Sequence, residues 1–109
     1  MAFDIGALVP PMLAAARGEL EDVWTEAKDF AETEFRKTAE TIALIERLHL
    51  EGTISEERAK LHLQFQKNSA QTVLLTIEGL GIIAAERAIN AALGAVRDTV
   101  NTALGFGLL

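Results

Sequence analysis

Two histidines are the residues of this chain whose side chains most readily do chemistry at neutral pH. His49 and His62 lie in matching Leu-His-Leu triplets on either side of a turn-like stretch near residues 52–55. If two helices fold back on each other at that stretch, the two imidazoles would lie at about the same height. Facing imidazoles can bind a metal or a haem iron, so one hypothesis is a bundle that binds haem or another apolar ligand.

A second pattern combines one histidine with carboxylates. Glu46 and His49 are three residues apart, so on a helix they share a face, as di-iron carboxylate bundles require. Following that face backwards leads to Glu32. Two copies of the chain could together supply a ferritin-like site for iron or manganese, with Glu32, Glu46, His49 and His62 as candidate ligands. The ferritin-like site is the alternative and not the leading hypothesis, because a chain with twelve glutamates can place one three residues before a histidine by chance.

Glu78 is the third candidate, because it interrupts the apolar run 74–80. On a continuous helix it would lie away from the polar stripe, and a buried carboxylate must be paired, bind a metal or take up a proton. We expect it to be a buried charge that pairs with Lys28 or with a base of a partner subunit; the alternatives are a metal ligand or a proton carrier. No catalytic residue is predicted, since no serine lies near an elbow and Gly79, Gly81 and Gly94 form no phosphate loop.

The elements that must position these residues are helices joined at one clear turn. Gly52 suits the left-handed position that ends a helix, and Ser55 is a good N-cap for the next one. The acidic residues Glu56 and Glu57 then lie in the first helical turn, where carboxylates are stabilising. The stretch 48–60 resembles a generic helical-hairpin turn of the kind seen in short oligomerisation modules, which implies no functional residue.

Apolar periodicity predicts two long helices on either side of that turn. The first, over residues 11–51, begins at Pro10-Pro11 and repeats apolar residues every three or four positions. The second, over residues 56–104, is apolar except for one polar stripe, with an alternative break near residues 79–81. Residues 59–66 alternate as in a strand, but their flanks favour a helix. The expected fold is therefore one all-α domain over 1–109, with an N-terminal arm (1–10) and a C-terminal tail (105–109).

Composition and charge exclude several classes of protein. The 109 residues are 50% hydrophobic, which argues against disorder, and the absence of cysteine excludes a disulfide scaffold. The net charge of −6 argues against nucleic acid as a partner. The chain begins without a basic signal sequence and has no uncharged apolar run long enough to span a membrane, so we expect it to be cytoplasmic. Association with a membrane surface is not favoured.

The apolar character of the second half predicts self-association. A hairpin of two helices has one mutual interface, so a lone chain would expose several large apolar residues, each worth roughly 1.5–3 kcal/mol when buried. They would be drawn, in some combination, from Val73, Leu74, Leu75, Ile77, Ile82, Ile83, Ile89, Leu93 and Val96. Two hairpins packed into a four-helix bundle with coiled-coil-like contacts, or a larger homo-oligomer, would cover them. The function expected is a non-enzymatic, self-assembling structural or scaffold subunit.

Overall fold

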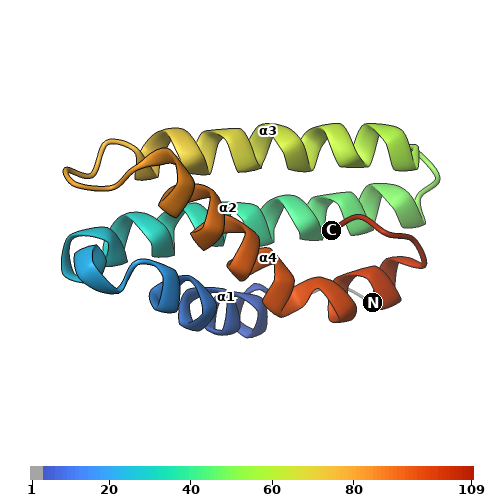
Figure 1. The fold of residues 1–109 in the computed structure, drawn as a ribbon. Coiled ribbons are helices and arrows are strands. Elements are labelled where there is room, and N and C mark those ends of the chain that lie inside the picture. The colour runs from blue at the N-terminus through green and yellow to red at the C-terminus, as the bar shows by residue number, and fades with distance from the viewer. Residues whose placement is uncertain (1–3) are drawn as a thin grey trace.

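The computed structural model describes residues 4–109 and is helical throughout, with no strand in that range (Figure 1). Its elements are α1 (Ile5–Glu19), the short 3-10 helix η1 (Glu21–Val23), α2 (Trp24–Leu50), α3 (Glu56–Leu74) and α4 (Ile82–Leu104). The predicted all-α class is confirmed. The elongated molecule, with principal extents of 43 × 22 × 18 Å, has α4 crossing diagonally from the end of α3 towards α1.

The predicted single helix over residues 11–51 is wrong, because the chain bends after α1. The backbone N–H of Leu20 closes α1 on the carbonyls of Ala16 and Arg17, and η1 follows before α2 begins. The bend folds α1 back onto the other helices and buries its apolar residues. A straight helix would project past the end of the bundle and leave those residues in water. The residues that α1 and its cap bury are Leu8, Val9, Met12, Ala16 and Leu20.

The start of α1 also differs from the prediction. The Asp4 side chain caps the helix by accepting a hydrogen bond from the backbone N–H of Gly6 at 2.9 Å. Pro10 and Pro11 therefore lie inside α1 instead of starting it, although proline removes a backbone donor there. Burial of the apolar residues on both sides of this pair offsets the loss. Of the expected N-terminal arm, residues 5–10 are helical and residues 1–3 lie outside the described range.

The signals between α2 and α3 act as predicted. Gly52 adopts a left-handed φ of +72°, and the Ser55 hydroxyl accepts a hydrogen bond from the backbone N–H of Arg58 at 3.1 Å. Residues 59–66, whose polarity alternates, are helical in α3. The two helices then lie side by side along the long axis (Figure 1).

The predicted second helix over residues 56–104 divides where the alternative break was placed. Residues 75–81 form a turn in which Gly79 has a φ of +87°. Glycine adopts this left-handed conformation without the steric cost of a Cβ. The turn lets α4 leave the end of α3 and run back across the bundle to α1.

The bundle covers much of its apolar second half within one chain. α4 packs most extensively on α1, and α2 on α3. Leu74, Ile77, Ile89, Leu93 and Val96 are buried as a result. One chain covers more of these residues than a two-helix hairpin would, because α1 forms a separate helix that packs on α4. Those that stay exposed are Leu75, Ile82 and Ile83.

The predicted tail over residues 105–109 is part of the bundle. Gly105 ends α4 with a φ of +81°, and Leu108 is buried. The Asn101 side chain holds the last residue by accepting from the backbone N–H of Leu109 at 3.0 Å and donating to its carbonyl at 3.3 Å.

None of the helices in residues 4–109 combines the length and the apolarity needed to cross a membrane. α1 has 15 residues, fewer than the ~20 that a bilayer core requires. In α4 the charged residues Glu86, Arg87, Arg97 and Asp98 are all exposed and interrupt its apolar sequence.

Candidate functional site

The two histidines lie in different environments. His49, near the end of α2, is half-buried and packs against Phe106, with ring centroids 5.0 Å apart and planes tilted by 58°. His62, in α3, is exposed. The structure thus gives His49 an aromatic neighbour from the C-terminal segment, a contact that no spacing in the sequence indicated.

The predicted carboxylate ligands are also separated. Glu32 forms a surface ion pair with Arg36 at 3.6 Å, the favourable i,i+4 pair of α2. Glu46 is buried and engaged in an interaction of its own. Fourteen residues at 1.5 Å rise put these two carboxylates about 21 Å apart along α2. Within residues 4–109, no group of three or more His, Asp or Glu side chains is placed to hold a metal ion.

Glu78 is exposed, so the prediction of a buried charge is wrong. The prediction assumed a continuous helix, whereas α3 ends at Leu74 and Glu78 lies in the turn at the end of the bundle. No ion pair joins it to Lys28 in the described part of the chain. It lines a depression of about 320 Å³ with two further carboxylates, Asp22 and Glu26.

A further buried charge in α2 is Glu34, which was not among the predicted site residues. Its side chain is 2% exposed and accepts a hydrogen bond from the Lys37 ammonium at 3.1 Å. The buried Thr38 hydroxyl donates to the backbone carbonyl of Glu34 at 2.9 Å. The available signal was that Glu34 and Thr38 are four residues apart on α2 and lie next to apolar positions. Their contacts are local and indicate a structural role.

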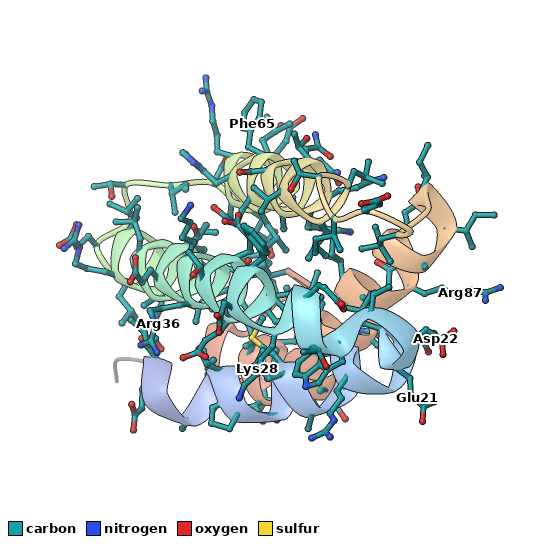
Figure 2. The ribbon with its side chains drawn as sticks, turned by 90° about the vertical axis from the view of Figure 1, so that its left-hand side faces the viewer. Glu21, Asp22, Lys28, Arg36, Phe65 and Arg87 are labelled. Carbon is teal, nitrogen blue, oxygen red and sulfur yellow. The ribbon has the colours of Figure 1, made fainter. Side chains whose placement is uncertain are left out.

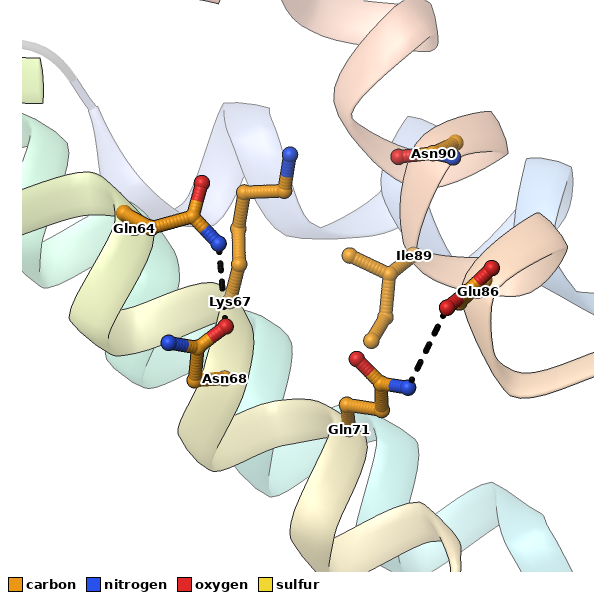
Figure 3. A pocket seen from close by; sticks show the side chains of 7 residues that line it. All are labelled: Gln64, Lys67, Asn68, Gln71, Glu86, Ile89 and Asn90. Atoms are coloured by element: carbon orange, nitrogen blue, oxygen red, sulfur yellow. Dashed lines mark hydrogen bonds between the residues drawn. The ribbon is translucent and has the colours of Figure 1, made fainter. Parts of the chain in front are cut away.

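A groove runs between α3 and α4 (Figure 3). At one end, a depression of about 180 Å³ contains two hydrogen bonds: Gln64 to Asn68 at 2.9 Å, and Gln71 to Glu86 at 3.5 Å. It continues into a second depression of about 290 Å³, with Gln64, Lys67 and Asn90 shared by both. The second depression is also lined by Lys60, Leu63, Leu93, Arg97 and residues 107–109. We call both together the α3–α4 groove.

The α4 wall of the groove comes from the polar stripe of the predicted second helix. On a continuous helix, Asn68, Glu86, Asn90 and Arg97 would follow one line along one side. The turn at residues 75–81 folds that line in two. The α4 part of that line, Glu86, Asn90 and Arg97, lines the groove. The facing α3 wall is made mainly of Lys60, Gln64, Lys67 and Gln71, which lie outside the stripe.

The second surface feature is the outer α3 face, which we define as Leu61, Phe65, Asn68, Thr72 and Leu75. All five residues are exposed, and Phe65 points away from the bundle (Figure 2). Leu61 is 53% exposed and Phe65 71% exposed. The five positions contain no charged residue, and their spacing of four, three, four and three follows a heptad seam.

Neither surface contains the nucleophile, base and orienting group of a recognisable catalytic arrangement among the described residues. The chemistry present is that of binding: carboxamides and cations in the groove, and aromatic and aliphatic side chains on the outer α3 face. No family model, curated protein or solved structure matches the chain.

Proposed function

We propose that this protein is a non-enzymatic helical subunit that self-associates, and that the outer α3 face is an interface between copies. The observation that carries the proposal is the exposure of Leu61 and Phe65, one helical turn apart on a face without charge. Large aromatic side chains in a patch depleted of charge are characteristic of interface cores.

The fold does not need this face for its own core. The buried side of α3, which packs towards the other helices, consists of Ala59, Leu63, Ala70 and Leu74. Leu61 and Phe65 lie on the opposite side of the same helix, so their apolar character contributes little to the stability of one chain. Their burial against a second copy would remove both side chains from water, at roughly 25 cal/mol per Å² of apolar surface.

The heptad spacing favours a second α3 helix as the partner. Four-three spacing keeps one row of side chains facing a neighbouring helix over several turns, which is the geometry of coiled-coil packing. Asn68 in the middle of the row could pair with a polar group of the partner and fix the register.

Light scattering coupled to size exclusion tests the proposal. The wild-type chain of 11.8 kDa is expected to elute with at least twice that mass. The double variant Leu61→Gln/Phe65→Gln is expected to lose this association while its circular dichroism stays helical. A matched control, Leu44→Gln/Leu50→Gln, removes two exposed leucines outside the face and should associate like wild type. A wild-type mass of 11.8 kDa at every concentration would refute the proposal.

A further inference from the structure

One half of the α3–α4 groove gathers cations that have no partner within the described chain. Lys60, Lys67 and Arg97 line the same depression, and none forms an ion pair with another residue of 4–109. The ion pairs of that range, Arg36–Glu32 and Lys37–Glu34, lie on α2. Lys67 is half-buried between the helices and rises between Gln64 and Asn90 (Figure 3). We call these three cations the basic half of the groove.

The opposite charge collects at the other end of the molecule. Glu21 and Asp22 of η1, Glu26 of α2 and Glu78 of the 75–81 turn are all exposed. We call these four residues the acidic corner. Three of them border the depression that also contains Val23, Phe30 and Ile77. Arg87 and Lys28 belong to neighbouring elements, and neither forms an ion pair with the corner in the described residues.

The two regions lie too far apart to meet within one copy. Lys60 is in the second turn of α3 and Arg97 is in the second half of α4, so the basic half lies towards the end where α2 meets α3 (Figure 1). The acidic corner lies at the other end, where α1 meets α2 and α3 meets α4. The long axis of 43 Å separates these ends.

From this placement we infer that the basic half of the α3–α4 groove binds the acidic corner of a second copy, head to tail. The inference rests on the proposed function, since it names a second contact between copies. Each region has apolar residues beside its charges, Leu63 and Leu93 in the groove and Val23 and Phe30 at the corner. The same pair of surfaces on every copy makes a heterologous contact, which leaves both ends open for further copies.

Glu86 gives the contact a direction. It lines the end of the groove away from Lys60 and Arg97, where its carboxylate accepts from Gln71. Like charge there disfavours an incoming carboxylate and directs it to the basic half. The other acids near that half, Glu56, Glu57 and Asp98, are not among the residues that line it.

Salt is the first test. Raising NaCl from about 0.1 M to about 1 M shortens the Debye length from ~10 Å to ~3 Å. Sedimentation velocity on the full chain should then show the highest-mass species falling to the two-copy species held by the outer α3 face. Association that is unchanged by salt would overturn the head-to-tail contact and leave the proposed function standing.

Charge reversal is the second test. Lys67→Glu and Glu26→Lys should each weaken head-to-tail association by about ten-fold. An equimolar mixture should restore a contact, because the intact corner of the first variant meets the intact groove of the second. Lys60→Glu, at an exposed position, repeats the test without altering a half-buried side chain. Lys28→Glu makes the same charge change outside the groove and should leave association intact.

The outer-face variant separates this inference from the proposed function. In a Leu61→Gln/Phe65→Gln background, head-to-tail binding should persist at low salt and vanish at high salt. If that background is monomeric at low salt while wild type is not, the head-to-tail contact is wrong and the outer α3 face is supported. Salt-sensitive association in that background equal to wild type would instead overturn the outer α3 face.

Discussion

α3 and α4 contrast in how the chain covers them. α4 buries eight residues along its length, mostly alanine, valine and leucine, and it packs most extensively on α1. α3 buries four residues on one side and leaves Leu61 and Phe65 exposed on the other. The more apolar helix is therefore the better covered one. Exposed apolar area therefore depends on which helices fold back: α4 is covered beyond its first turn, where Ile82 and Ile83 stay exposed, and α3 keeps its outer face exposed.

Small residues explain why α1 and α4 can approach closely. Ala16 in α1 and Ala85, Ala88 and Ala92 in α4 are completely buried. Alanine lets two helix backbones come near each other, which increases the number of atoms in van der Waals contact. On the outer α3 face, by contrast, Leu61 and Phe65 are large and exposed.

The largest difference between a buried and an exposed position is expected for two phenylalanines. Phe35 in α2 is 1% exposed and Phe65 in α3 is 71% exposed. Phe35→Ala should lower the free energy of unfolding by about 3–5 kcal/mol, because it leaves a cavity in the core. Phe65→Ala should change it by no more than about 0.5 kcal/mol at concentrations where the chain is monomeric. Urea denaturation of both variants measures the difference, and equal losses would contradict the contrast.

A smaller effect is expected where the close approach of α4 is overfilled. Ala88→Leu adds three heavy atoms at a completely buried position and should cost about 1–3 kcal/mol of unfolding free energy. Ala95→Leu makes the same change on the exposed side of α4, where both residues are good helix formers, and should be nearly neutral. Thermal denaturation followed by circular dichroism compares the pair. If Ala88→Leu costs no unfolding free energy, α4 is not tightly covered at position 88.

The smallest effects are expected at the helix starts. Ser55 caps α3 through its hydroxyl, whereas Gly81 begins α4 without a side-chain cap. Ser55→Ala should therefore destabilise by about 1 kcal/mol. Gly81→Ser should stabilise by a few tenths of a kcal/mol, about 0.3, because its φ of −88° accommodates a side chain and its hydroxyl can accept from the first turn. Chemical denaturation resolves both, and a stabilising Ser55→Ala would contradict the capping role.

The turn after α2 was predictable because its signals are local. Gly52 supplies a left-handed conformation and Ser55 supplies an acceptor, and both depend on the residues next to them in sequence. The bend after α1 has no such signal. Leu20 and Val23 continue the apolar spacing of a long helix, and only burial against distant residues distinguishes the bent chain from a straight one.

The candidate sites followed the same division. Glu78 was predicted to be buried because periodicity was continued through a turn, and its exposure follows from the end of α3. Glu34 was missed because a glutamate on a helix is ordinarily exposed, while its burial comes from the packing of α2. The position of the groove could not be predicted from the polar stripe alone, since the groove forms only when residues 75–81 reverse the chain.

Amino-acid order alone determined that the protein is helical and where the central turn lies. These properties depend on interactions within a few residues: periodic side-chain spacing, capping and glycine conformation. Tertiary structure decided that one chain makes four helices, that α1 covers α4, and that three cations border a single groove. Those outcomes depend on the total burial contributed by residues far apart in the chain, and the periodicity of the sequence does not reveal which distant residues pack together.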